Sequence, residues 1–153
     1  AFSYNNIMKI NYTRDTLSST YLDAVKIRNI VFVQGQGVPL TIEVDKNEAH
    51  CIHFVLYDAK NRAVATCRLL PTQDGITATL QRMAVLPGNR GKNYGKLILD
   101  AATDFAKKQG YQQMTLHAQL SAKGFYQRMQ FKSLGQEFEE AGIKHITMTK
   151  ALS

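Results

Sequence analysis

The stretch from Ile76 to Ala118 constrains the fold most, because a strand, a helix and another strand follow one another with short connections. Residues 76–86 have the composition of a strand. Residues 92–109 carry their apolar side chains on one helical stripe, and Gly110 supplies the residue type that ends a helix. Residues 111–118 form a further strand. Since a single helix joins the two strands, we expect them to be parallel neighbours in one sheet.

The segments on either side of this crossover predict the remaining elements from hydrophobic periodicity and turn residues. They are a strand at 8–13, a long helix at 17–34, a polar loop at 38–49, strands at 50–57 and 62–70, a helix at 121–129 and strands at 131–138 and 143–150. The order β-α-βββ-α-β-α-ββ predicts a mixed α+β domain. Its central sheet, of about six or seven mostly antiparallel strands, is flanked by helices.

Chain length predicts a single domain over residues 8–153, with residues 1–7 as an N-terminal extension. No apolar run approaches the roughly 20 residues that cross a bilayer, and no secretory signal is visible, so we expect a cytoplasmic protein without membrane association. Cys51 and Cys67 are then expected to be reduced, buried and inert. A turn at 58–61 predicts that residue 51 pairs with residue 68, which puts the two thiols on opposite faces of the sheet.

The net charge of +7, from 19 basic and 12 acidic residues, favours an anionic partner. A phosphorylated cofactor and nucleic acid both meet this description. Nucleic acid is the weaker alternative, because the basic residues are scattered and form no long tract. The histidines and cysteines do not have the spacing of a metal site, so no metal is expected.

The turn "PGNRGKNYGKLILD", Pro87 to Asp100, concentrates basic residues and glycine at the start of a helix. The first turn of a helix has unpaired N–H groups and the positive end of the helix dipole. Arg90, Lys92 and Lys96 add positive charge around those amides. The turn is therefore either a phosphate-binding site suited to a diphosphate or an exposed helix start with solvated charges.

The string "LQRMAVLPGNRGKNYGKLIL", followed by "AKGFYQRMQF", resembles the GNAT superfamily, the GCN5-related N-acetyltransferases. The family's loop has the pattern Arg/Gln-x-x-Gly-x-Gly/Ala. Arg90 and Gly95 match its outer positions, and Gly91 matches a common additional glycine. Asn93 replaces the inner glycine, and asparagine is among the non-glycine residues that best tolerate a left-handed backbone.

Further segments resemble the ElaA/YjcF-like branch of that superfamily, so that the resemblance covers roughly residues 8–150. They are "VFVQGQGVP", in which Gly35 stands where the branch usually has Glu, Glu43-Val44-Asp45, Ala49-His50 and "EEAGIKHITM". The resemblance implies the GNAT fold and an acetyl-CoA-dependent transfer of an acetyl group to a primary amine of a small molecule or protein. Family members often form homodimers.

The resemblance also implies where acetyl-CoA binds. The diphosphate would lie on the backbone of the basic turn, formed by Arg90, Gly91, Lys92, Asn93, Tyr94, Gly95 and Lys96. The preceding strand and the strand at 111–118 would separate, and the pantetheine arm would bind main-chain groups of Met83, Ala84 and Val85 between them. Gln119 occupies a place where the family often has Asn, and is either a hydrogen-bond partner of that arm or a polar strand end.

Tyr126 lies where the family commonly places the general acid that protonates the leaving thiolate. The alternative is a packing tyrosine whose hydroxyl has a local partner. Nearby, Gln130 replaces a family glycine, and a left-handed backbone there would cost roughly 1 kcal/mol.

The general base remains open, because Thr79, Gln81 and Arg82 provide no carboxylate on the strand where many relatives carry Glu. A water-mediated base is one possibility. The candidate side chains are His117, on a strand face beside the expected cleft, Glu43 and Asp45, on a loop that either lines the acceptor site or is merely solvated, and His50 and His53. The functional alternative is an acyl-CoA-binding sensor of the same fold without catalysis.

Overall fold

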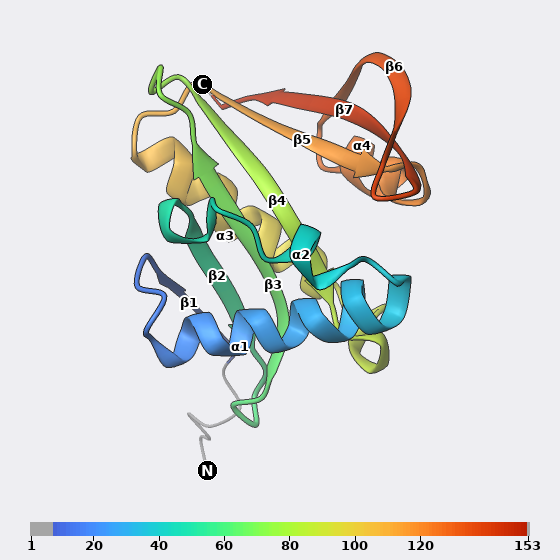
Figure 1. Cartoon of the computed structure of the whole chain (residues 1–153). Helices are drawn as coiled ribbons and strands as arrows, with labels where there is room; N and C mark the ends of the chain where they lie inside the picture. Colours follow the sequence, from blue (N-terminus) through green and yellow to red (C-terminus); the bar gives the residue numbers. More distant parts are fainter. Residues whose placement is uncertain (1–7, 153) are drawn as a thin grey trace.

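The computed structural model describes residues 8–152, except for the side chains of Thr41 and Ile42; the expected extension at 1–7 lies outside the described residues. A seven-stranded sheet has the order β1-β2-β3-β4-β5-β7-β6 (Figure 1). Only β4 and β5 pair in parallel, as the crossover helix predicted. The strands are β1 Lys9–Thr13, β2 Ile52–Tyr57, β3 Ala63–Pro71, β4 Thr77–Val85, β5 Gln113–Gln119, β6 Lys132–Glu140 and β7 Ile143–Ala151.

Helices lie on both faces of this sheet. The face that contacts α1 is called the α1 face here, and the opposite one, which contacts α3, the α3 face. The helices are α1 Ser19–Arg28, the π-helix η2 Asn29–Gln34, α2 Leu40–Glu43, α3 Tyr94–Lys108 and α4 Lys123–Arg128, and short 3₁₀ turns are η3 Glu48–His50, η4 Pro87–Asn89 and η5 Leu120–Ala122.

The helix that joins the parallel strands, α3, has the predicted amphipathic form. Its buried residues include Ile98, Leu99 and Ala102, whereas Asp100 and Asp104 on the other side are exposed. Gly110 follows the helix with φ +94°, and the N–H of Tyr111 bonds to the carbonyl of Ala106 five residues back. A left-handed residue in this position closes the helix end, so glycine is suited to it.

The predicted helix at 17–34 changes type along its length. Ser18 caps α1 by accepting a hydrogen bond from the N–H of Tyr21, but the α-helix gives way to the π-helix η2 at Asn29. The change falls at the apolar run Ile30 to Val33, where β-branched side chains crowd a regular helical turn. The loop expected at 38–49 is likewise not wholly irregular, since it contains α2 and begins η3.

The predicted pairing of β2 with β3 is wrong by two residues. His53, not Cys51, lies opposite Arg68, because the register of the two strands shifts between Leu56 and Tyr57, next to the turn. An even shift preserves the face of each side chain, so the two cysteines still lie on opposite faces. Both are free and buried, and burial raises the pKa of Cys51 to about 11, which keeps the thiol protonated and unreactive as expected.

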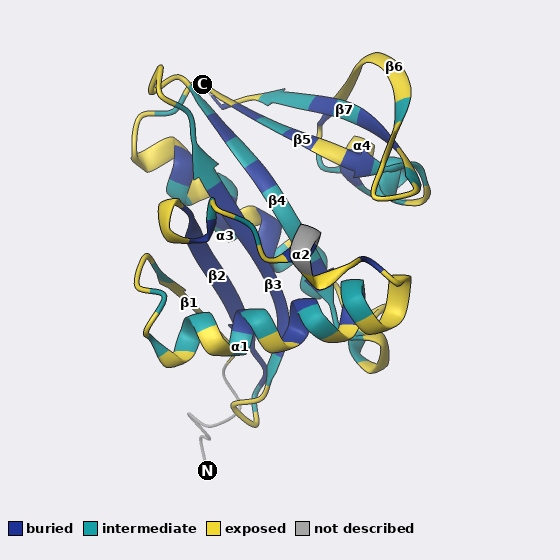
Figure 2. Cartoon of the chain, in the orientation of Figure 1, coloured by how far each residue is buried: buried dark blue, intermediate teal, exposed yellow. Residues whose placement is uncertain are grey.

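The main core lies between the α3 face and α3 and reaches α4 and β7, and Figure 2 shows β2 and β3 buried along their length. A smaller apolar cluster on the α1 face joins Ala24, Ile27 and Val31 to Val55, Tyr57 and Ala84. By contrast, β6 is mostly exposed. The sheet is therefore firmly packed up to β5, where the strands that form the candidate site separate.

Candidate active site

The site begins where β4 and β5 separate. Their parallel pairing runs from Thr77 and Gln113 to Leu80 and Leu116 and stops there, although both strands continue. Figure 1 shows the two strands diverging from this point. We call the space between residues 81–85 of β4 and residues 117–119 of β5 the wedge. Separated strands leave main-chain groups without a ladder partner, so the wedge edges can bind a ligand rich in amides.

A bulge in β4 lies at the apex of the wedge. Arg82 has φ +57°, and the register with β3 shifts between Thr66 and Arg68. Beyond the bulge, the N–H of Leu86 bonds to Val64 on β3. Because main-chain groups alternate along a strand, those of Met83 and Val85 point toward the wedge. Ala84, by contrast, is buried in the α1-face cluster, so the three residues of the predicted arm-binding strand are not equivalent.

The basic turn connects β4 to α3 at the mouth of the wedge. Gly91 and Asn93 are both left-handed, with φ +82° and +64°, and Asn93 is the residue that precedes the first turn of α3. Asparagine thus adopts the conformation expected of the glycine that it replaces. Within the described residues, no side chain caps this helix end. Its first N–H groups therefore remain available for an anion.

Three basic residues, Arg90, Lys92 and Lys96, lie in or next to this turn, and their side chains are exposed. The Nε of Arg90 donates to the carbonyl of Val85 at 3.2 Å, which ties the turn to the end of β4. Lys96 forms a 3.0 Å ion pair with Asp100 one helical turn later, whereas Lys92 lies at the turn itself. The resulting positive field is strongest where the helix amides are unpaired.

Gly95 leaves room between the start of α3 and the side of α4. A Cβ on Gly95 would lie 3.4 Å from the ring of Phe125 and 3.9 Å from Val85. A methyl group at this position would make ordinary van der Waals contacts, but a larger side chain would have to displace the Phe125 ring. The sequence analysis did not identify Phe125 as part of the site, although it directly precedes Tyr126.

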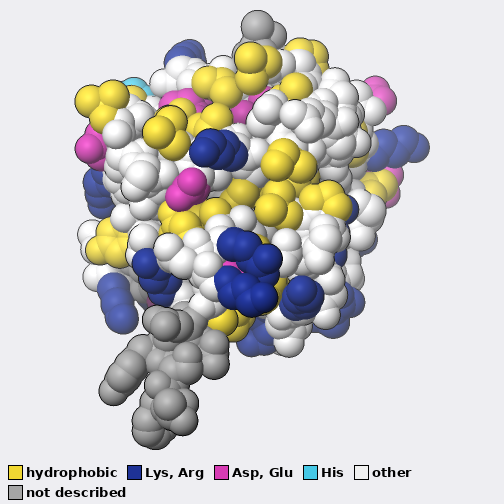
Figure 3. Space-filling view, turned by 90° about the horizontal axis from the view of Figure 1, so that it is seen from below, with side chains coloured by type: hydrophobic (Ala, Val, Ile, Leu, Met, Phe, Trp, Pro, Cys, Tyr) yellow, Lys and Arg dark blue, Asp and Glu magenta, His cyan; other side chains and the backbone are white. Residues whose placement is uncertain are grey.

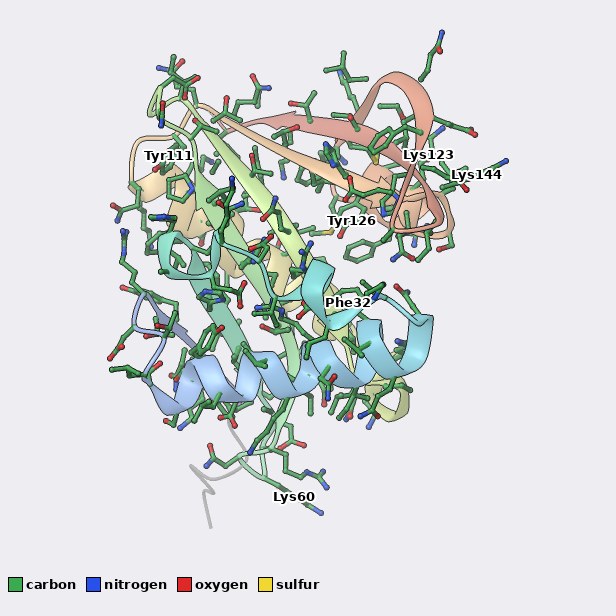
Figure 4. All side chains as sticks on the ribbon, viewed as in Figure 1. Phe32, Lys60, Tyr111, Lys123, Tyr126 and Lys144 are labelled. Carbon is green, nitrogen blue, oxygen red and sulfur yellow. The ribbon has the colours of Figure 1, made fainter. Side chains whose placement is uncertain are left out.

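Tyr126 lies on α4 near the diverging strand ends (Figure 4) and is 6% exposed. The helix that carries it is shorter than the one predicted at 121–129, because η5 precedes it and its cap position is Ala122. Burial raises the pKa of Tyr126, and proximity to the Cys67 thiol adds to this effect. The hydroxyl is therefore protonated at neutral pH.

The hydroxyl of Tyr126 has no described protein partner. In residues 8–152, the one side-chain polar atom that is fully buried without a hydrogen bond is Nδ1 of His53. The Tyr126 oxygen is not in this group, so it is not fully enclosed by protein atoms. The end of α4 holds it in place: Gln130 has φ +74°, and the N–H of Phe131 bonds back to the Tyr126 carbonyl at 3.0 Å. Gln130 is thus left-handed, as its family position suggested.

Gln119 is held by a partner that the sequence did not indicate. Its amide exchanges two hydrogen bonds with the amide of Gln36, of 3.3 Å and 3.0 Å, across 83 residues of sequence. The pair joins the end of β5 to the segment after η2. Gln119 therefore lies at the edge of the wedge on the α1 face, with its amide hydrogen-bonded to Gln36.

His117 is the first residue of β5 beyond the last pair with β4. Since Leu116 belongs to the core on the α3 face, His117 points to the α1 face. Its side chain is 50% exposed, and its Nδ1 lies 2.8 Å from a carboxylate oxygen of Glu140 on β6. Glu140 was expected in a turn, but β6 extends to this residue and pairs it with Ile143.

Glu43 and Asp45 belong to a buried ion-pair cluster, which we call the arginine cluster. The alternative that the two carboxylates are merely solvated is wrong for Glu43, which is 2% exposed. The cluster ties α2 and its flanking segment to α1, β3 and the β4 bulge, and Glu48 at its centre also accepts a hydrogen bond from Tyr21. Its ion pairs are Arg28–Glu43, Arg28–Glu48, Arg68–Asp45, Arg68–Glu48, Arg82–Glu43 and Arg82–Asp45.

The pKa values of the cluster follow from its pairing. Burial opposes ionisation of Glu48, but hydrogen bonds and charge from Arg28, with further contributions from Tyr21 and Arg68, outweigh it and lower its pKa. The pKa of Asp45 is lowered in the same way, chiefly by Arg68 against the effect of burial. These carboxylates are thus held in the charged form by their arginines.

The other histidine candidates lie away from the wedge apex. His53 is 0% exposed, burial lowers its pKa, and its Nε2 lies 2.9 Å from the carbonyl of Glu48. His50 is exposed in η3 and not in the strand predicted for it. Among the five candidate bases, His117 alone combines an accessible ring with a position at the strand divergence.

Within 8–152, no helix has the length and apolarity that a membrane crossing requires, and no group of three or more metal-ligating side chains comes together. On the face shown in Figure 3, the Lys and Arg side chains form separate groups between apolar and neutral ones. That face lacks the continuous basic stripe typical of a nucleic-acid groove.

A sheet that opens between two parallel strands, with a basic helix start at its mouth, is the arrangement of a GNAT-type acyltransferase. Comparison with known proteins agrees with this class. Residues 41–152 match the family model of the acetyltransferase (GNAT) domain, and the chain belongs to this family.

Two relatives come from Bacillus subtilis strain 168. The uncharacterized protein YyaT is 35% identical over 147 residues, which are 94% of this chain and 97% of YyaT. The uncharacterized N-acetyltransferase YjcF is 34% identical over 129 residues, 84% of this chain and 90% of its own. The crystal structure of Escherichia coli ElaA is similar with a TM-score of 0.80 at 21% identity, covering 94% of this chain and 99% of ElaA. The GNAT fold and the resemblance to ElaA and YjcF are confirmed.

Proposed function

We propose that the protein is an acetyl-CoA-dependent N-acetyltransferase that acts on a primary amine of a small molecule or a protein. The observation that carries the proposal is the divergence of β4 and β5 immediately beyond Leu80 and Leu116, with the uncapped start of α3 at its mouth. Membership of the GNAT family supports the same class of reaction.

The residues present fit acetyl-CoA at both ends of the wedge. For the diphosphate, Gly91 and Asn93 give the turn its left-handed backbone, the start of α3 has no side-chain cap, and three exposed basic residues lie in or beside the turn. For the amide-bearing arm, β4 offers the main-chain groups of Met83 and Val85. When bound there, acetyl-CoA supplies the acyl group and a thiol as the leaving group.

Two side chains are proposed to move protons. Tyr126 Oη would donate a proton to the departing sulfur, because the hydroxyl is protonated at neutral pH and forms no hydrogen bond with a described group. His117 Nε2 would accept the proton that the acceptor amine loses as it forms its bond to the acyl carbon. Glu43 is given a positioning role instead, since its carboxylate is paired with Arg28 and Arg82.

The test combines binding with turnover. Purified protein should bind CoA, which calorimetry measures, and should release free thiol from acetyl-CoA in the presence of a suitable amine from a panel. Gly95→Leu should raise the Kd for CoA roughly tenfold or more, because the side chain must displace Phe125. Gly88→Leu is the matched control, since a Cβ there meets nothing within 4 Å.

Two outcomes would contradict the proposal. Equal CoA affinity in the Gly95 and Gly88 variants would mean that the diphosphate lies elsewhere. CoA binding without acetylation of any amine in the panel would favour the non-catalytic acyl-CoA sensor of the same fold.

A further inference from the structure

We infer that Glu140 is a positioning residue that holds the His117 ring with Nε2 as its basic nitrogen, and that Phe138 supports the ring from the side. This inference rests on the proposed function, in which His117 accepts the proton of the acceptor amine. It adds a residue from the last hairpin, β6–β7, which nothing in the resemblance assigns to the reaction.

The first observation is the placement of three side chains on one face. His117 lies opposite Thr147 of β7, and Gln119 lies opposite His145, which in turn lies opposite Phe138 of β6. Residues that are paired across a ladder share a face, as do residues two apart on one strand. His117, Phe138 and Glu140 therefore all lie on the α1 face, where the wedge opens.

The second observation is that two different contacts restrain the imidazole. Nδ1 lies 2.8 Å from Oε2 of Glu140, and the ring meets Phe138 edge to face at 4.9 Å between centroids and 78°. Phe138 is itself stacked on His145 at 5.9 Å and 22°. His145 is 7% exposed and its Nδ1 lies 2.7 Å from the carbonyl of Ile143, so the support for Phe138 is buried.

The chemistry of the Nδ1 contact determines the tautomer. An ionised carboxylate only accepts hydrogen bonds, so the Nδ1 that faces Glu140 must carry hydrogen. In a neutral ring, the lone pair is then on Nε2. When Nε2 takes a proton, the carboxylate of Glu140 lies beside the new positive charge and stabilises it. In the His117–Glu140 pair, Nε2 of the neutral ring can accept a proton but carries none to donate.

The third observation concerns position along β5. His117 directly follows Leu116, the last residue paired with β4, and Gln81 directly follows Leu80. Gln81 accepts hydrogen bonds from Arg68 on the α1 face, at 3.0 Å and 2.7 Å. The histidine and the arginine cluster thus approach the wedge apex from its two sides. An acceptor amine that reaches the apex from the α1 face would meet the His117 ring.

The experiment measures two properties of the full chain. The ¹⁵N shifts of the His117 ring nitrogens report the tautomer, and steady-state kinetics with an acetylated amine report the reaction. Glu140→Gln keeps an acceptor for Nδ1 but removes the charge, whereas Glu140→Ala removes both. Glu139→Gln is the matched control, because Glu139 is the exposed neighbour on the opposite face and pairs with Lys144.

We expect Glu140→Gln to lower kcat at least about tenfold, because a stabilising charge beside the imidazolium is lost, with the KM for acetyl-CoA unchanged. Glu140→Ala should also move hydrogen from Nδ1 to Nε2 in a substantial fraction of molecules. Glu139→Gln should change neither property. A double variant with His117→Gln should be no slower than His117→Gln alone, since Glu140 acts only through that ring.

The outcomes separate this inference from the proposed function. If His117→Gln is impaired but both Glu140 variants match Glu139→Gln in kcat and in ring shifts, the positioning role is overturned and the function stands. If the wild-type protein acetylates no amine, the proposed function and the catalytic part of this inference fail together. The ring shifts of Glu140→Ala then still decide whether Glu140 fixes the tautomer.

Discussion

At the scale of single residues, two side chains of the same type can have different roles because their surroundings differ. Tyr126 and Tyr21 illustrate this difference. Burial raises the pKa of both, but Tyr21 donates to Glu48 at 2.7 Å, whereas the Tyr126 hydroxyl has no described partner. A fully buried hydroxyl usually finds a hydrogen-bond partner. The Tyr126 oxygen is not fully enclosed, and we attribute its missing hydrogen bond to a partner that arrives with the substrate.

The Tyr126→Phe variant tests this explanation. We expect kcat to fall by roughly 10² or more, because protonation of the leaving sulfur is lost, while the melting temperature stays close to that of the wild type. Stopped-time thiol-release assays and thermal unfolding measure the two quantities. Tyr111→Phe serves as the control, and equal loss of activity in both variants would contradict the assignment.

At the scale of elements, left-handed residues mark the ends of the helices that frame the wedge. Asn93 precedes α3 and Gln130 follows α4, and both occupy positions where the family has glycine. The left-handed backbone costs more free energy at glutamine than at asparagine, because the longer side chain does not form the compensating local hydrogen bond. The end of α4 is therefore a place where stability can be gained.

Gln130→Gly should stabilise the protein by roughly 1 kcal/mol through removal of this strain. Chemical denaturation followed by circular dichroism measures the free energy of unfolding. The same substitution at Gln127, inside α4, should instead destabilise the protein by about 1 kcal/mol, since glycine is a poor helix former. Destabilisation of equal size at both positions would show that the strain at Gln130 is negligible.

At the scale of the whole molecule, the arginine cluster connects the segment after η2 with the centre of the sheet. Arg28 and Arg68 are each 1% exposed, so their pairing with Glu43, Asp45 and Glu48 is required for the segment to pack. An unpaired charge in such a place costs several kcal/mol. The segment after η2, which borders the wedge on the α1 face, is thus held in place by buried ion pairs as well as by apolar contacts.

Acid stability should reflect the cluster. The pKa of Glu48 is lowered from its ordinary value of 4.5, so the unfolded chain binds more protons than the folded protein as the pH falls through that value. The contribution of Glu48 is complete above about pH 4.5 and is lost progressively as the pH falls toward its folded pKa. Urea denaturation at pH 7 and pH 4 measures this loss.

Glu48→Gln should cost about 3 kcal/mol at pH 7, because Arg28 and Arg68 lose a buried partner. It should also flatten the dependence of stability on pH below 4.5. Lys96→Gln, which breaks the Lys96–Asp100 pair whose two side chains are both exposed, is the control and should change the free energy of unfolding by less than about 1 kcal/mol. An acid dependence that is unchanged in Glu48→Gln would refute this account.

Much of the fold follows from the sequence, because local periodicity and short connections leave few arrangements. The stripe on α3 and the closing Gly110 define a crossover, and a crossover requires parallel strands. The left-handed conformation of Asn93 was also predictable, since the position belongs to a loop motif and asparagine tolerates that geometry. The basic turn and Tyr126 could be proposed as site residues for the same reason: each lies in a contiguous motif.

The partners of the site residues were decided only by tertiary structure. Glu140 is 23 residues from His117, and Gln36 is 83 residues from Gln119; only the strand register and the packing of η2 bring them together. Glu43 showed the same limit, since nothing local indicates that Arg28 and Arg82 will enclose it. Sequence by itself determined the elements and the motifs, because these depend on neighbouring residues. Tertiary structure decided which side chains meet, because pairing depends on register and burial across the sheet.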